Sequence, residues 1–360
     1  MNSKIFISPK PVQLENGVRK MRKYILIILG VLVCGAQLYA QGVTKTGTTA
    51  AGFLAIDVGS RGTAMGSAYV SVVNDATAMY WNPAGIARLE NFQATFSNTK
   101  WIADLSLNYA GAVLPLGNFG TIGVNATFLT MDQIERTTII QPDGTGELFD
   151  AGSYAIGLSY ARSLTDLFSI GFNAKYINER VYHSNANGFA FDVGALFDTR
   201  FLGLKLGMSI SNFGTKMQLD GRDLQVQVDV DPGVTGNNPN INARLQGDEY
   251  DLPLMFRVGV STDILEKSEN NSLILAVDAL HPSDDLEFMN VGMEYILYNM
   301  FSLRAGLSEL LAEDSEHSFT VGAGLQYTIA DKTTLNFDYS YLNLGVFDAI
   351  HMFSVGLGLK

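Results

Sequence analysis

The stretch Ser153-Tyr154-Ala155-Ile156-Gly157-Leu158-Ser159-Tyr160 decides the fold. Large apolar side chains alternate in it with small ones, and a period of two places them on opposite faces of a β-strand. From Phe92 to Lys360 the chain repeats this pattern in about fourteen segments of about ten residues each. Strands of soluble sandwiches average about five or six residues, whereas about nine to eleven are needed to cross a hydrocarbon layer roughly 30 Å thick. The sequence therefore predicts an all-β protein, a 14-stranded antiparallel transmembrane β-barrel.

The connections between these segments alternate in length. Short ones such as 116–118 and 298–299 contrast with the two longest, 131–150 and 213–251. Barrels of the outer membrane have short periplasmic turns and long outer loops. We therefore expect the long loops to point outward and both termini to be periplasmic. The expected strands are 92–98, 104–114, 119–130, 151–162, 167–180, 188–198, 202–212, 252–262, 271–280, 287–297, 300–308, 317–329, 333–341 and 349–359.

The N-terminus has the features of an export signal. A basic cluster at 19–23 precedes an apolar run at 24–34, and small residues follow up to Ala40. This order predicts a signal peptide over residues 1–40, with a natural start at Met21. Lipid attachment at Cys34, the only cysteine, is a minor alternative because bulky Val33 precedes it. Residues 41–360 contain no cysteine, which excludes disulfides and thiolate chemistry from the mature protein.

The charge balance excludes nucleic acid as a partner. The full chain has 24 basic and 36 acidic residues; six basic and one acidic lie within 1–40, which leaves 18 and 35 and a net charge of −17. Affinity for nucleic acid comes mainly from basic groups that neutralise phosphates. No mature segment is apolar for eighteen residues in a row, so we expect no transmembrane helix.

Seven charged residues lie on the small, polar faces of the predicted strands. Charges at membrane depth are tolerated only toward a polar lumen, so we expect these side chains to point inward. Mutual pairing that holds the barrel together is the preferred interpretation, with a substrate path as the alternative. The residues are Lys175, Asp192, Arg257, Asp278, Glu294, Arg304 and Asp338.

No set of residues points to catalysis, a cofactor or a metal. The four histidines, at 183, 281, 317 and 351, fall near strand ends without metal-ligand spacing. Serines next to two of these histidines supply two residue types of a lipase triad, but no third polar group that would orient the histidine is evident. The acidic stretch 220–231 is read as solvated loop charge rather than a calcium site. We therefore expect a protein that is not an enzyme and has no cofactor.

Residues 41–90 differ from the rest because they lack sustained alternation and are rich in Gly, Ala, Ser and Thr. Asn74 or Asp75 could cap a helical turn, and Asn82-Pro83 should end it, since a residue before proline disfavours the helical region. We interpret 41–90 as a plug or hatch segment packed in the barrel mouth, and 91–360 as the barrel.

This segment resembles a known signature. The string from Gly59 to Glu90 is similar to the N-terminal motif of the PorV/PorQ family of outer-membrane proteins of Bacteroidota-type bacteria. Its Asn-Pro-Ala element is shared more widely with the FadL-like fatty acid transporters, which are fourteen-stranded barrels with a hatch. The last segment, from His351, also resembles the last strand of the family. Two residues depart from the family pattern: Gly62 stands where alanine is more usual, and the chain ends on Lys360 where an aromatic residue is common. The matching residues are Arg61, Ala64, Met65, Gly66, Ala68, Tyr69, Val70, Asn74, Asp75, Ala76, Asn82, Pro83, Ala84 and Gly85.

The resemblance implies two functions. A PorV-like barrel binds the C-terminal signal domains of type IX secretion cargo and shuttles them for export and surface attachment, so its partners are cargo proteins or secretion-machinery subunits. A FadL-like barrel is a channel for hydrophobic small molecules. Transport needs an apolar path, and the expected lumen face is Gly, Ala, Ser, Asn and charge, which favours cargo binding. A purely structural barrel is the third possibility. Whether the motif residues touch a ligand or only shape the plug stays open.

Overall fold

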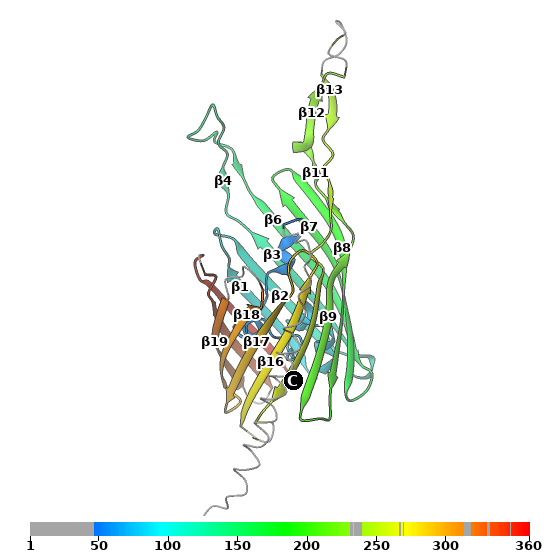
Figure 1. The fold of residues 1–360 in the computed structure, drawn as a ribbon, viewed down its shortest axis with the longest axis vertical. Coiled ribbons are helices and arrows are strands. Elements are labelled where there is room, and N and C mark those ends of the chain that lie inside the picture. The colour runs from blue at the N-terminus through cyan, green and yellow to red at the C-terminus, as the bar shows by residue number, and fades with distance from the viewer. Residues whose placement is uncertain are drawn as a thin grey trace, which may run out of the picture. The chain divides into compact units, whose positions relative to one another are not determined.

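The chain forms a closed antiparallel barrel (Figure 1). The structure, a computed structural model, describes residues 47–230, 233, 240–265, 268, 270–312, 318–329, 332–345 and 347–360; the expected signal peptide and His317 lie outside them. Pairing of the first and last strands, from Phe92 with Leu359 to Lys100 with His351, closes the sheet. The predicted 14-stranded barrel is thereby confirmed. The strands are β1 (Phe92–Lys100), β2 (Ser106–Pro115), β3 (Thr121–Thr130), β6 (Ala151–Ser163), β7 (Phe168–Val181), β8 (Ser184–Asp198), β9 (Leu204–Gly214), β15 (Met255–Asp263), β16 (Asn271–Pro282), β17 (Phe288–Leu297), β18 (Phe301–Leu310), β19 (Ser318–Ile329), β20 (Thr333–Leu342) and β21 (Ile350–Leu359).

The outer surface of the barrel is apolar. Along β8 exposed and buried residues alternate, and the exposed set includes Phe189 and Phe191, each 57% exposed. Phe172 on β7 and Phe353 on β21 point outward in the same way. Contiguous apolar surface of this kind is unfavourable in water and favourable against lipid. Within the described residues, no helix has the length and apolar character needed to cross a membrane.

One connection differs from its prediction. We expected β8 to begin at residue 188, but β7 and β8 pair as far as Val181 and Ser184, so only Tyr182 and His183 form the turn. The sequence did not predict these extra residues of β8, because the apolar alternation stops at Asn185 and Asn187 while the backbone pairing continues. This turn is short although it lies at the end of the barrel that carries the long loops.

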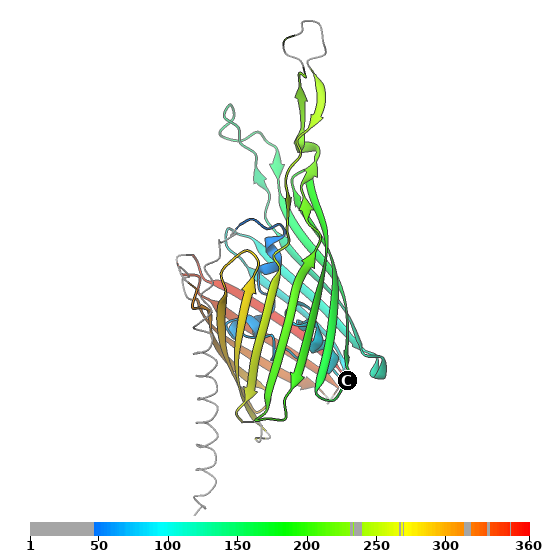
Figure 2. The same ribbon diagram turned by 45° about the vertical axis from the view of Figure 1, so that its right-hand side comes forward.

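The two longest loops contain strands of their own and rise beyond the barrel (Figure 2). In the first, β4 (Ile134–Glu135) pairs with β5 (Leu148–Phe149). In the second, β10 (Met217–Gln218) pairs with β14 (Glu249–Tyr250), and β12 (Gln225–Val228) with β13 (Ile241–Arg244). Between β10 and β12, the chain forms β11 (Asp220–Gly221), which pairs with β8, and the short helix η4 (Arg222–Leu224). We call this end of the barrel the long-loop end, and the end with connections such as 116–120 and 298–300 the short-turn end.

Residues 51–91, which we call the inner segment, lie within the barrel (Figure 1). They form η1 (Gly52–Ala55), α2 (Ser60–Ala64), α3 (Ala78–Trp81) and η2 (Pro83–Arg88). The expected cap at Asn74 or Asp75 is wrong, since α3 begins at Ala78. Asp75 instead accepts a hydrogen bond from the Thr77 backbone N–H at 2.8 Å, which shapes the turn before the helix. The predicted end of the helix at Asn82 is correct, because Asn82 is extended.

The described chain starts and ends at opposite ends of the barrel. Thr49 donates a hydrogen bond to Asp284 at 2.6 Å, and the Ala50 N–H bonds the Asp251 carbonyl, both at the long-loop end. Lys360 follows β21 at the short-turn end. The N-terminus itself lies outside the described residues, so the expectation that both termini are periplasmic stays a prediction. Thr49 and Lys360 lie at opposite ends because the inner segment runs the depth of the lumen before β1 begins.

Candidate functional site

Glycines on the inner faces of the strands admit the backbone of the inner segment. A Cβ added to Gly171 would lie 2.3 Å from the Pro83 carbonyl carbon, and one on Gly207 would lie 2.4 Å from the Val70 carbonyl oxygen. On the other side of the barrel, a Cβ on Gly306 would lie 2.1 Å from the Gly66 nitrogen. The small residues of the alternating pattern are therefore seats for the inner segment, and not only the lining of a polar lumen.

The Asn-Pro-Ala-Gly element of the motif forms a corner held by hydrogen bonds. The Asn82 amide donates to the carbonyls of Val70 at 2.9 Å and Ala195 at 3.1 Å, and its Oδ1 accepts the Ala84 N–H at 3.2 Å. Pro83 takes the first position of η2, where its missing N–H costs nothing. Gly85 packs so closely on Val73 that a Cβ there would lie 2.9 Å from the valine side chain. These residues join the inner segment to β8.

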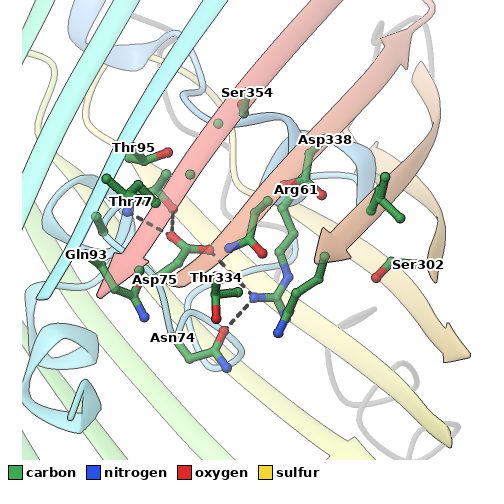
Figure 3. A pocket seen from close by; sticks show the side chains of 18 of the residues that line it. Arg61, Asn74, Asp75, Thr77, Gln93, Thr95, Ser302, Thr334, Asp338 and Ser354 are labelled. Atoms are coloured by element: carbon green, nitrogen blue, oxygen red, sulfur yellow. Dashed lines mark hydrogen bonds and ion pairs between the residues drawn. The ribbon is translucent and has the colours of Figure 1, made fainter. Parts of the chain in front are cut away.

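Two further motif residues, Asn74 and Asp75, lie beside Arg61 (Figure 3). Its guanidinium forms a two-pronged pair with Glu294 of β17, with donor–acceptor distances of 2.9 and 2.7 Å. It also donates to Asn74 at 2.5 Å and lies 3.6 Å from Asp75. Bidentate arginine–carboxylate pairs are strong and geometrically specific. Met65 and Gly66 lie one turn further on, fully buried against β17 and β18.

Some of the inward charges pair with one another as expected. Lys175 pairs with Asp192 at 2.9 Å, and Arg304 binds both Glu294 at 2.7 Å and Asp338 at 2.6 Å. All of these except Asp338 are buried. The predicted mutual pairing is thus confirmed for five of the seven charges.

The remaining two inward charges contact the inner segment. Arg257 lies over the rings of Tyr80 and Trp81, at 5.7 and 5.6 Å from their centroids. Asp278 accepts the Val70 N–H at 2.8 Å. These contacts were not predicted, because they join residues far apart in the sequence; Val70 and Asp278 are 208 positions apart. The two aromatic rings partly stabilise the charge of the buried arginine.

A polar cavity of about 330 Å³ lies at the short-turn end. Its walls come from residues 59–61 and 74–77 of the inner segment and from β1 and β17–β21. Figure 3 shows hydroxyl and amide side chains around it, among them Gln93, Ser302 and Thr334. Most of the charged groups in its wall, Arg61 and Asp338 among them, are the ion-paired ones described above, and Lys360 also lines it. This cavity is suited to water and small polar molecules.

An apolar cluster fills the lumen toward the long-loop end. Phe53 and Leu54 of η1, 4% and 6% exposed, pack there against the inner faces of β2, β6, β7 and β8. The Ala51 N–H donates to Glu179 at 3.0 Å and fixes the start of η1. We call this set the outer apolar cluster; its wall residues include Leu107, Tyr109, Ala155, Ile177, Ala186, Ala190, Met217 and Leu252. The expectation of a lumen that is small and polar throughout is therefore wrong at this end.

The described residues at the long-loop end form charge pairs and hydrogen bonds, and no catalytic set occurs among them. His183 contacts Asp223 at 3.1 Å, His281 contacts Glu287 at 2.9 Å, and His351 contacts the Tyr339 hydroxyl at 2.7 Å. No group of three potential metal ligands occurs in the described residues. The Arg180 guanidinium binds both oxygens of Asp150, at 2.7 and 2.9 Å, and holds the pKa of that carboxyl below its usual value.

Comparisons with known proteins agree on the fold. No protein-family model and no curated protein matches the chain. Among solved structures, the chain is similar to the monoaromatic hydrocarbon channel CymD, at 12% identity over 84% of this chain and 97% of that one, with a TM-score of 0.55. It is similar to the Ralstonia pickettii toluene transporter TbuX, at 12% identity over 84% and 98%, with a TM-score of 0.53. It is also similar to the Pseudomonas putida toluene transporter TodX, at 10% identity over 84% of this chain and 98% of that one, with a TM-score of 0.50. At these identities the likeness shows a shared fold.

Proposed function

We propose that this protein is an outer-membrane channel for small apolar molecules of the FadL-like class. Its apolar outer surface fits a bilayer, and short turns at one end with long loops at the other fit an orientation in which the long loops face outward. Solved barrels with the same fold include channels for toluene and other monoaromatic hydrocarbons. Under this proposal the partners are membrane lipid and an apolar ligand, and the protein is not an enzyme.

The outer apolar cluster carries the proposal. A ligand that entered from the long-loop end would meet aliphatic and aromatic side chains such as Leu107 and Ile177, the kind of lining that apolar ligands need. The space among them is taken by Phe53 and Leu54 of the same chain. Apolar contacts are not directional, so a small aromatic molecule can replace these two side chains without loss of specific bonds.

Titration of 4-fluorotoluene into the purified protein, followed by ¹⁹F NMR, tests this proposal. We expect a saturable site. The F53A/L54A variant should bind about tenfold more tightly, because its chain no longer competes for the site and a larger fraction of the protein is binding-competent. Leu158→Ala on the lipid-facing surface, where Leu158 is 66% exposed, is the matched control and should bind like the wild type. Non-saturable partitioning into detergent alone, in both the wild type and F53A/L54A, would rule the channel out.

The two long loops favour a second candidate, the cargo shuttle of type IX secretion. Their hairpins β4–β5 and β12–β13 stand beyond the barrel and offer a surface that a channel for small molecules does not need (Figure 2). The motif around Arg61 also supports this candidate, because it resembles the N-terminal motif of the PorV/PorQ family. On this candidate the cargo domain or a secretion-machinery subunit docks on the loops, while the inner segment only closes the barrel.

The loop at 213–251 can be shortened while all fourteen barrel strands are kept, although β11 and its pairing with β8 are lost. Residues Met217 and Gln218 pair with Tyr250 and Glu249, so a turn of Asn-Gly in place of 219–248 should keep this neck intact. We expect the shortened protein to lose co-purification of cargo from native membranes while it keeps fluorotoluene binding. Cargo recovery equal to that of the full chain would remove the second candidate.

A further inference from the structure

The inner segment is tied to the barrel wall at the short-turn end by a chain of four charges. Arg61 of the segment binds Glu294 of β17; Glu294 also binds Arg304 of β18, which binds Asp338 of β20. We call these four residues the latch. Glu294 is fully buried, and Arg304 is 6% exposed. Charge pairs in a low-dielectric interior are strong when each partner is bonded, and costly when one partner is removed.

Arg61 also joins two separate parts of the inner segment. It belongs to α2, and its guanidinium bonds Asn74 at 2.5 Å and lies 5.5 Å from the centre of the Tyr69 ring. Tyr69 in turn donates to Asp75 at 2.6 Å. One side chain therefore holds together the wall, α2 and the turn at 74–77.

The polar cavity lies directly against these contacts. Residues 59–61 and 74–77, which Arg61 brings together, form one part of its boundary, and β1 and β17–β21 form the rest. Arg61 is 18% exposed and Asp75 25%, so water in the cavity reaches the latch. Gly171 of β7 and Gly207 of β9 seat the backbone of the inner segment elsewhere on the wall and do not line the cavity.

We infer that the latch is the release point of the inner segment: breaking the Arg61–Glu294 pair opens an aqueous path from the cavity into the lumen along β17–β21. This inference rests on the proposed channel, since release matters only if the segment moves. The structure also separates the two halves of the latch. When Arg61 is removed, Glu294 keeps Arg304 and Arg304 keeps Asp338, so the wall stays paired.

Ion conductance of the purified protein in planar bilayers, in potassium chloride and without any apolar probe, tests the inference. The wild type should be nearly closed. Arg61→Ala should raise the mean conductance about tenfold or more, as expected when a two-state equilibrium loses a contact made in only one state. Arg61→Lys keeps the charge but loses the bidentate geometry, so it should give an intermediate value.

Arg88→Ala is the matched control. Arg88 also belongs to the inner segment and pairs with the wall, through Asp198 at 2.8 Å, but it does not line the cavity. It should conduct like the wild type. A folded Arg61→Ala with wild-type conductance, or an Arg88→Ala rise of equal size, would overturn the inference; if Arg61→Ala does not fold, Arg61→Lys at the wild-type level would do so. A conductance rise together with absent fluorotoluene binding would count against the channel function alone.

Discussion

The two ends of the lumen hold the same inner segment by different physics. At the long-loop end, Phe53 and Leu54 lie in the outer apolar cluster, and the Ala51 N–H, which bonds Glu179, fixes the start of η1 beside the hydrogen bonds of Thr49 and Ala50. At the short-turn end, Arg61 makes directional, charge-assisted bonds to Glu294 and Asn74 beside a polar cavity. Apolar contacts can be exchanged for a ligand of similar shape, whereas a buried ion pair has no such substitute. On the proposed channel function, a ligand would enter at the long-loop end and the latch would close the short-turn end.

Loss of the shared carboxylate should have the largest effect. Glu294→Ala leaves both Arg61 and Arg304 without their common partner, and breaking a buried pair in this way costs about 3 to 5 kcal/mol. We expect a large fall in unfolding temperature, measured by circular dichroism. An unfolding temperature near that of the wild type would mean that the short-turn end is not held by charge.

A cavity made at the long-loop end should lower the free energy of unfolding by less, and an apolar ligand should partly restore it. Leu54→Ala removes a buried side chain, a change that costs about 2 to 4 kcal/mol in a packed core. Because the empty space is apolar, saturating toluene should restore part of the lost unfolding temperature, and it should restore none in Glu294→Ala. Equal rescue of both variants would erase the distinction between the two ends.

A glycine seat tests whether the wall itself holds the segment between the two ends. Gly306→Ala forces a Cβ against the Gly66 backbone, and overpacking of this kind costs about 1 to 3 kcal/mol. Gly358→Ala is the matched control, because its nearest neighbour would be Thr334 at an ordinary 3.6 Å. Trypsin cleavage within 51–91 should increase in the first variant only. Identical digestion of the two would show that the seat is not needed.

The smallest effect should come from the exposed pair at the long-loop end. Arg180 lowers the pKa of Asp150. The pair therefore stabilises the 131–150 loop at any pH above the ordinary pKa of an aspartate, and this contribution is lost as the pH falls through the lowered pKa. Exposed pairs contribute little. Asp150→Asn should therefore increase hydrogen exchange of the loop slightly at neutral pH and not at pH 2. A change at both values would point to a role other than charge.

The sequence predicted the barrel and the corner at Asn82, but not the contacts that hold the inner segment. The outward faces repeat because lipid requires an apolar residue at every second position, and this local rule is readable in one strand. Gly306 and Gly358 look alike in the sequence, although only the first meets the backbone of the inner segment. Arg61 and Glu294 are 233 positions apart, so no local pattern joins them. The apolar residues Leu107 and Ile177 interrupt the small inner faces and were the available sign of the outer apolar cluster.

A crystal of the protein soaked in bromobenzene tests the central claim most directly, because the anomalous signal of bromine locates the ligand. The account predicts a bromine peak inside the outer apolar cluster, between Leu107 and Ile177, with Phe53 and Leu54 displaced from their places. A peak only in the polar cavity at the short-turn end, or only on the lipid-facing surface, would contradict it.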